Sequence, residues 1–135
     1  MSEAAPVGKT ILVVEGDDAT REGLAVLLEA EGYTVGAAGD GQAALDYLLT
    51  QPQPAMPAMI LLDMRLPVWD GWRFLAERDA FPSLRQIPVV MMTGIASVCR
   101  EQAQAHGCAG FVPNRAVVNE LLAEIGWCLT PGEPA

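Results

Sequence analysis

Short apolar segments alternate along the chain with amphipathic ones. A short run that is apolar almost throughout is typical of a parallel β-strand buried on both faces. This pattern predicts strands at 10–14, 33–37, 59–63, 89–93 and 109–112. Segments with apolar residues at helical spacing separate the strands. They predict helices from Asp17 or Asp18 to Gly32, and over 42–50, 71–79, 97–106 and about 117–125.

Most of the predicted helices carry apolar residues that we expect to face the core. These are Leu24, Leu27 and Leu28 in the first helix, Leu45, Leu48 and Leu49 in the second, Trp72, Phe74 and Leu75 in the third, and Val117, Val118, Leu121, Leu122 and Ile125 in the last. The segment from Pro82 to Pro88 is read as a connection, because prolines punctuate regular structure.

Strands that alternate with helices imply a parallel sheet covered by helices on both faces. Because crossovers between parallel strands are right-handed, few arrangements remain. We expect a flavodoxin-like (βα)5 doubly wound α/β fold with strand order 2-1-3-4-5. In that order Glu15 and Asp63 follow neighbouring strands, and Thr93 ends the next one. Chemistry in open α/β sheets takes place at the carboxyl ends of the strands, so these side chains mark a candidate site.

Length and charge limit the possible functions. The 135 residues correspond to one domain, expected over 8–128 with flexible tails at 1–7 and 129–135. Eight basic residues cannot cancel seventeen acidic ones, and the net charge of -9 argues against nucleic acid or an anionic membrane as a partner. No apolar run is long enough to span a bilayer and no signal-peptide pattern is present, so we expect a cytoplasmic protein.

The three cysteines, Cys99, Cys108 and Cys128, follow no disulfide or zinc pattern and are expected to be reduced, half-buried thiols. A metal site built from Cys99, His106 and Cys108 would lack a fourth ligand and the usual spacing. The pair His106-Gly107 instead predicts the end of a helix, with the glycine in the left-handed conformation.

Three motifs give the chain its most specific character. They are Ile11-Leu12-Val13-Val14-Glu15, Asp63-x-x-x-Pro67-x-x-Asp70-Gly71 and Thr93-Gly94. In these motifs the sequence resembles the receiver domain of bacterial two-component response regulators, and the resemblance covers nearly the whole chain.

The resemblance implies that Asp63 is a phosphoacceptor. Its carboxylate would attack a phosphoryl group carried by a histidine kinase or a phosphotransfer protein, in a reaction that depends on positioning and charge neutralisation. By the same resemblance, Thr93 contacts the phosphoryl group and Phe111 moves with it as a switch. Glu15, Asp63 and the backbone carbonyl of Arg65 would hold Mg²⁺. The chain would be a signalling protein and not an enzyme, catalysing at most its own phosphorylation and dephosphorylation.

Two positions depart from the family. Gly16 stands where the family has a second acid, so we expect weakened Mg²⁺ binding, and Asp17 is better explained as a helix cap. Asn114 stands at the position of the family's lysine, and Arg115 follows where the family has proline. A neutral hydrogen bond contributes about 1 kcal/mol and a charge-assisted one about 1.5–3 kcal/mol, so the phosphoryl group would be held less well. Arg65 or Arg115 is a candidate for supplying the missing charge.

These departures leave two functions open. In the first, the chain is a stand-alone receiver domain in a phosphorelay, phosphorylated on Asp63. In the second, it is a degenerate receiver that binds proteins independently of phosphorylation. In both, a downstream protein is expected to bind the face formed by the fourth helix, the fifth strand and the fifth helix, near Phe111. Trp69 and Trp72 either add contacts or pack the third helix.

Other functions of the same fold class are less well supported. A flavodoxin-like flavin or nucleotide binder would carry a hydroxyl-rich phosphate loop after the first strand, and none is found there. A hydrolase that uses an Asp-x-Asp motif would need an acid at the position of Arg65.

Overall fold

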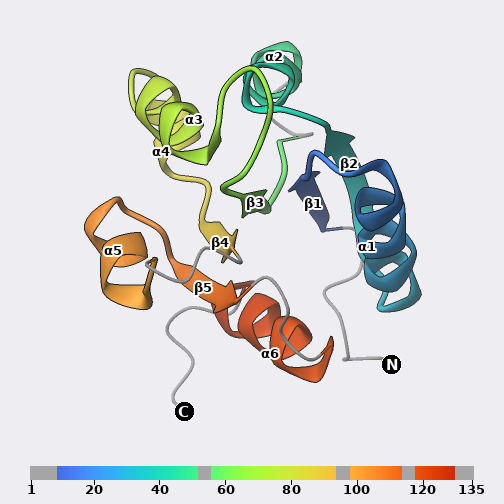
Figure 1. Ribbon diagram of the computed structural model, residues 1–135. Helices are drawn as coiled ribbons and strands as arrows, with labels where there is room; N and C mark the ends of the chain where they lie inside the picture. Colours follow the sequence, from blue (N-terminus) through green and yellow to red (C-terminus); the bar gives the residue numbers. More distant parts are fainter. Residues whose placement is uncertain (1–8, 52–55, 94–97, 114–117, 130–135) are drawn as a thin grey trace.

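A computed structural model describes residues 9–51, 56–93, 98–113 and 118–129. Five parallel strands form one sheet in the order β2-β1-β3-β4-β5, which confirms the predicted flavodoxin-like fold (Figure 1). The strands are β1 (Thr10–Val14), β2 (Thr34–Ala38), β3 (Met59–Asp63), β4 (Val89–Thr93) and β5 (Gly110–Pro113). Every residue of β3 and β4 is buried, as the apolar runs predict for central strands.

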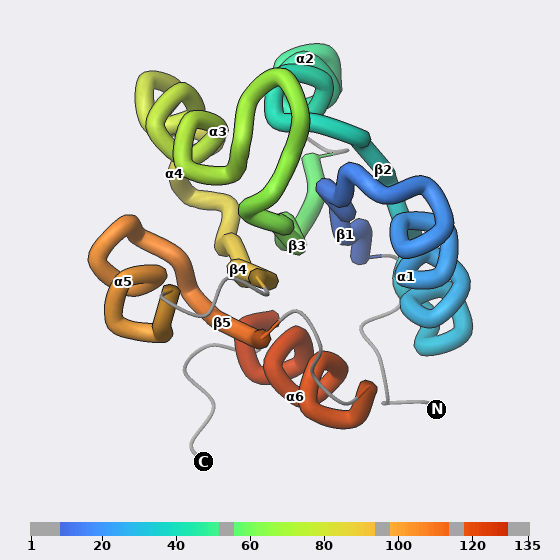
Figure 2. Tube along the Cα trace, in the orientation of Figure 1, coloured from blue at the N-terminus to red at the C-terminus, as the bar shows by residue number. Residues whose placement is uncertain are grey.

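Helices cover both faces of the sheet. They are α1 (Asp18–Ala30), α2 (Gly41–Thr50), α3 (Gly71–Arg78), α4 (Pro82–Arg85), α5 (Arg100–Ala105) and α6 (Val118–Leu129). Helices α1 and α6 lie on one side of the sheet, and α2 to α5 lie on the other (Figure 2). In the described part of the chain, no helix has the length and apolar composition that a membrane span requires.

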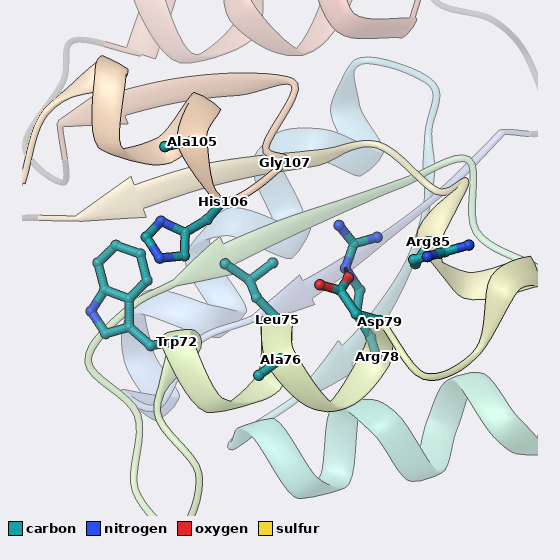
Figure 3. A pocket seen from close by; sticks show the side chains of 9 residues that line it. All are labelled: Trp72, Leu75, Ala76, Arg78, Asp79, Arg85, Ala105, His106 and Gly107. Carbon is teal, nitrogen blue, oxygen red and sulfur yellow. Dashed lines mark ion pairs between the residues drawn. The ribbon is translucent and has the colours of Figure 1, made fainter.

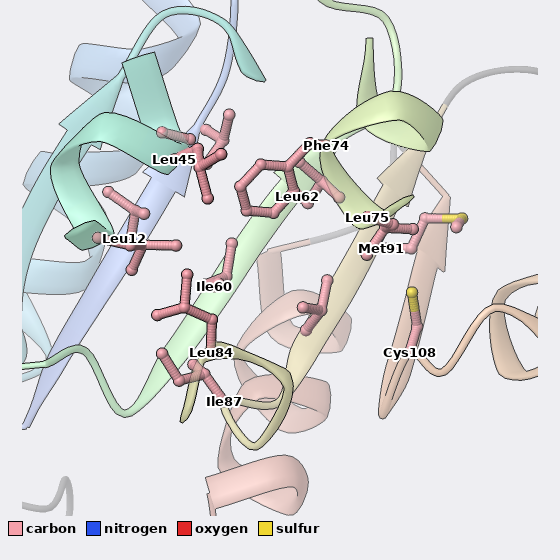
Figure 4. Close-up of a cluster of buried hydrophobic side chains, with 14 of the residues drawn as sticks. Leu12, Leu45, Ile60, Leu62, Phe74, Leu75, Leu84, Ile87, Met91 and Cys108 are labelled. Atoms are coloured by element: carbon pink, nitrogen blue, oxygen red, sulfur yellow. The ribbon is translucent and has the colours of Figure 1, made fainter. Parts of the chain in front are cut away.

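The sheet separates two hydrophobic clusters. The larger one packs β-strand side chains such as Leu12 and Ile60 against Leu45, Phe74 and Leu84 of the helices (Figure 4). The second cluster packs the opposite face of the strands against α1 and α6. Burying a large apolar side chain contributes roughly 1.5–3 kcal/mol, so these two clusters are the main source of stability.

Aspartates fix the starts of three helices. Asp17, Asp40 and Asp70 each precede a helix, and each side chain accepts a hydrogen bond from a backbone N–H three residues later, at 2.8, 2.7 and 2.9 Å. Such a cap contributes about 1 kcal/mol. The cap predicted at Asp17 is therefore confirmed, Asp40 caps α2, and Asp70 caps the helix that leaves the β3 end.

Several predicted details were wrong. The connection after α3 contains the short helix α4, which begins at Pro82 because proline is well suited to the first helical turn. Leu49 and Val118, which were expected to face the core, are about half exposed. Cys99 is exposed at the start of α5, whereas Cys108 and Cys128 are buried in the two clusters.

Some boundaries also differ from those predicted. β2 and β5 each begin and end one residue later than expected, and α5 is confined to Arg100–Ala105. The helix does end at His106, with Gly107 at a φ of +85°, as predicted. Leu129 belongs to α6 and not to a tail, while residues 1–7, 117 and 130–135 lie outside the described ranges.

Candidate functional site

The strand register brings the two predicted acids together. Val14 pairs with Leu62, so Glu15 and Asp63 are next in line on adjacent strands. Asp63 in turn pairs with Met92 of β4, which places Thr93 one position further along that strand. All three side chains are at least 95% buried. We refer to Glu15, Asp63 and Thr93 as the strand-end site.

Glu15 and Asp63 form a buried carboxyl pair at the ends of adjacent strands. A hydrogen bond between two carboxyl groups requires that they share a proton. Burial raises the pKa of Glu15 to about 7, and the neighbouring Asp63 adds to the increase. Burial also raises the pKa of Asp63, but the bond from Glu15 counteracts that effect. The interaction between the two groups therefore favours the proton on Glu15 over Asp63.

Backbone groups after β3 orient the Asp63 carboxylate. The Arg65 N–H donates to Asp63 Oδ1 at 3.2 Å. The following loop returns to the sheet where the Gly71 N–H donates to the Met64 carbonyl at 3.1 Å. A Cβ on Gly71 would approach Met64 Cα to within 2.8 Å, so only glycine lets α3 pack this closely beside the acid. This contact explains why the motif that follows Asp63 ends in Gly71.

The structure favours the cap interpretation of Asp17. Its carboxylate accepts hydrogen bonds from the Thr20 N–H and hydroxyl, both at 2.8 Å, and these bonds lower its pKa. Its backbone N–H donates to Glu15 Oε2 at 3.1 Å. Asp17 therefore supports Glu15 through its backbone while its own carboxylate is directed to α1.

Gly16 lies where an additional acid would reach the site. A Cβ built on Gly16 would lie 3.8 Å from the Arg65 carbonyl oxygen and 3.1 Å from Pro67 Cδ. A side chain at this position would thus extend beside the carbonyl that the family resemblance assigns to the metal. The second acid that the resemblance implies at this position would therefore place a carboxylate here, which Gly16 does not.

The donor set fits a hard divalent cation. Glu15 Oε1 is buried and has no hydrogen-bond partner among the described residues. Mg²⁺ is usually bound through one or two carboxylates and several waters, and two carboxylates with the Arg65 carbonyl meet that requirement. Groups of three or more His, Cys, Asp or Glu side chains arranged for a metal are not found in the described ranges. If Mg²⁺ replaced the shared proton, it would neutralise charge on a bound phosphoryl group.

The remaining predicted site residues are Phe111, Asn114 and Arg115. Phe111 is partly buried on β5; its N–H donates to Glu124 Oε2 at 2.9 Å, and its carbonyl accepts from Arg100 at 3.1 Å. The Arg100 guanidinium also lies 6.0 Å from the Phe111 ring centre and 3.0 Å from Glu124 Oε2. Phe111 is therefore held between α5 and α6. Asn114 and Arg115 lie outside the described residues, so the structure does not test their assignments.

Sequence reasoning missed two features near the site. Arg21 of α1 donates to the Glu15 carbonyl oxygen at 2.8 Å and so anchors the chain as it leaves β1. Val68, in the loop after Asp63, has a φ of +66° and is 70% exposed. A β-branched residue rarely adopts that conformation, which is strained. In the sequence, only the position of a charged residue near the start of a predicted helix indicated a role for Arg21. Nothing in the sequence indicated the backbone conformation of Val68.

Comparison with known families agrees with this geometry. The family model described as the response regulator receiver domain matches residues 11–126. The chain belongs to the response regulator receiver family. This match includes both carboxylates of the strand-end site, Gly16 and Thr93.

Individual receiver-containing proteins are similar over most of the chain. The response regulator MprA of Mycobacterium avium is 31% identical over 125 residues, covering 92% of this chain and 52% of that protein. The probable methanogenesis regulatory protein FilR2 of Methanothrix harundinacea is 39% identical over 87 residues, covering 62% of this chain and 56% of that protein. The chain spans between 36% and 56% of the length of these and similar curated relatives.

Solved receiver structures share the fold. The receiver domain of the sensor histidine kinase PA1611 from Pseudomonas aeruginosa aligns with a TM-score of 0.79 and 27% identity, covering 91% of this chain and 98% of that one. That structure contains a magnesium ion in its active site cleft. A putative response regulator from Chloroflexus aurantiacus also aligns with a TM-score of 0.79, at 24% identity over 90% of this chain and 98% of its own.

Proposed function

We propose that this receiver domain accepts a phosphoryl group on Asp63 from a histidine kinase or a phosphotransfer protein. The observation that carries the proposal is the buried pair at the strand ends, where Asp63 lies beside Glu15 and its carboxylate accepts a hydrogen bond from the Arg65 N–H. A buried carboxylate that a backbone N–H holds in position is suited to attack phosphorus. The chain would act as a signalling domain, with no turnover beyond its own phosphorylation and dephosphorylation.

The proposed transfer needs few groups from the protein. An oxygen of the Asp63 carboxylate forms a bond to phosphorus while the bond from phosphorus to the donor's nitrogen or oxygen breaks, and the leaving group takes the electron pair and a proton. The Arg65 N–H holds the carboxylate in position. The Thr93 hydroxyl, at the neighbouring strand end, would hydrogen-bond to a phosphoryl oxygen. Positioning and charge neutralisation account for most catalysis in such transfers.

The proposed output is protein binding at the face formed by α5, β5 and α6. A cavity of about 450 Å³ lies on this face, and Arg100, Phe111, Glu124 and Trp127 contribute to its lining. Trp127 is 52% exposed, and aromatic residues are common anchors at protein interfaces. The net charge of -9 makes a protein a better partner for the domain than nucleic acid.

Incubation of the full chain with acetyl phosphate and Mg²⁺, followed by intact-mass measurement, tests the proposal. We expect a species heavier by one phosphoryl group, which Asp63→Asn abolishes. Asp17→Asn is a suitable control, because it also removes one carboxylate next to the site but leaves Asp63 intact.

If neither acetyl phosphate nor a cognate kinase produced that species, the proposal would be wrong. The domain would then be a receiver that binds proteins independently of phosphorylation.

A further inference from the structure

A second site lies on the helical layer formed by α3, α4 and α5. A cavity of about 480 Å³ opens there, and it shares no lining residue with the strand-end site (Figure 3). Cavities of about 300–1,000 Å³ are typical of small-molecule sites. The side chain of Arg78 rises from α3 in the middle of the view, between Arg85 on one side and the ring pair of Trp72 and His106 on the other.

Arg78 is an unusual residue to find in this position. It is 97% buried, and its guanidinium donates to the carbonyl oxygens of Leu84 at 3.0 Å and Ile87 at 3.3 Å. Among the described residues its Nε is buried without a hydrogen-bond partner, and an Asp79 carboxylate oxygen lies 3.9 Å from it. Arginine does not lose its proton in proteins, so the charge stays in place. A buried cation of this kind is under-neutralised by its own protein.

The other lining residues define the ligand that would complete the site. Among the described charged residues of the lining, only Asp79 opposes Arg78 and Arg85, in a chain whose net charge is -9. The lining is therefore locally positive. At the other end, the rings of Trp72 and His106 lie 4.7 Å apart at an angle of 55° and provide a surface for a planar group.

We propose that this cavity binds a small molecule consisting of a planar aromatic ring that carries one anionic group. The anionic group lies against Arg78 and Arg85, where it supplies the missing counter-charge. The ring lies against Trp72 and His106. A nucleoside monophosphate and an aromatic carboxylic acid share this chemistry. The site is independent of the function proposed for Asp63.

The proposal is tested by titrating the full ¹⁵N-labelled chain and following the indole N–H signal of Trp72. The probes are adenosine monophosphate and 4-hydroxybenzoate. The controls are adenosine, which lacks the anionic group, and inorganic phosphate, which lacks the ring. We expect saturable binding of at least one probe, and weaker binding of both controls. Binding of the nucleotide alone or of the carboxylate alone would support the proposal and identify the source of the anion.

Charge-matched variants separate this site from general electrostatic attraction. Arg85→Gln should weaken binding by about tenfold, because a charge-assisted contact is lost. Asp79→Asn should tighten binding, because it removes the only opposing carboxylate of the lining. Arg73→Gln removes the same charge from the same helix, outside the cavity, and should have little effect.

Three results would overturn the proposal. The first is that neither probe binds at millimolar concentration. The second is that adenosine binds as well as adenosine monophosphate, and the third is that Arg85→Gln and Arg73→Gln weaken probe binding equally.

Discussion

The strand-end site and the surroundings of Arg78 bury opposite charges in similar ways. Glu15 and Arg78 are each at least 95% buried, and each has one side-chain atom, Oε1 or Nε, that lacks an ordinary hydrogen-bond partner. At the strand ends, two carboxyl groups are buried side by side, and burial raises the pKa of both, which favours a proton held between them. Under α4, arginine cannot give up its proton, so backbone carbonyls have to stabilise the charge.

This difference separates a reactive site from a structural one. A proton that can leave makes the carboxyl pair responsive to pH, to a cation and to a phosphoryl donor. A permanent charge on Arg78 instead ties α3 to the segment from α4 to β4, and it can respond only to an anion. The two sites should therefore react differently to substitution, to pH and to Mg²⁺.

The largest expected effect is on the free energy of unfolding when the permanent charge of Arg78 is removed. Arg78→Met should lower the free energy of unfolding by about 3–4 kcal/mol, because two buried carbonyls lose a charged donor and the packed side chain is lost. Urea unfolding at pH 7 measures the change. Arg85→Met, which replaces an exposed arginine of α4, should change the stability by about 0.5 kcal/mol or less. Similar values for the two variants would show that Arg78 has no structural role.

The next effect is the pH dependence of the carboxyl pair. The folded pKa of Glu15 is about 7, above its ordinary value of 4.5, so the folded state keeps a proton that the unfolded chain releases. The stability that Glu15 contributes should therefore be fully present below pH 4.5 and should be lost as the pH rises through 7, by on the order of 2–3 kcal/mol. Glu15→Gln cannot titrate and should flatten this decline in urea unfolding measured from pH 5 to 8.

Asp46→Asn on α2 serves as the control for Glu15→Gln, because its side chain is exposed and lies away from the pair. The wild-type decline should persist in this variant. An equally steep decline in Glu15→Gln would contradict the assignment of the shared proton to Glu15.

A smaller effect concerns the missing acid. Gly16→Asp should place a carboxylate beside the Arg65 carbonyl and increase Mg²⁺ affinity by about 10–100-fold. Gly16→Asn has nearly the same shape without the charge, and it shares the close contact with Pro67, so it should show little of this gain. Calorimetric titration with Mg²⁺ compares them. The wild-type melting temperature should rise only slightly in millimolar Mg²⁺, and a shift of many degrees would count against a weakened site.

The smallest effect concerns the strained loop at the strand-end site. Val68→Gly should increase stability by about 0.5–1 kcal/mol, because glycine adopts a positive φ without strain. Val26 is similarly exposed, at 67% against 70%, but lies within α1. Val26→Gly should therefore lower stability by a similar amount, and equal signs for the two variants would contradict the strain at Val68.

The sequence predicted the sheet and the acid pair because both depend on local patterns. The continuous apolar runs identified β1, β3 and β4 to the residue, and the topology then placed Glu15 beside Asp63. The helix caps were also readable, since an aspartate before an apolar helix satisfies its first N–H groups.

The features that were missed depend on tertiary contacts. Arg78 is buried only because α4 folds over it, and α4 itself is too short to leave an apolar pattern. The positive φ of Val68 is imposed by a loop that has to close on Met64 and α2. Likewise, the exposure of Leu49 depends on where α2 meets its neighbours, which helical spacing alone does not determine.

The most direct test of the central claim is to locate the phosphoryl group chemically. After treatment with acetyl phosphate and Mg²⁺, hydroxylamine converts an aspartyl phosphate to a hydroxamate, and tandem mass spectrometry of peptides identifies the modified residue. We expect the hydroxamate on Asp63 and on no other carboxylate. A hydroxamate on Glu15 or Asp17, or on no residue at all, would contradict the account of Asp63 as the reactive member of the pair.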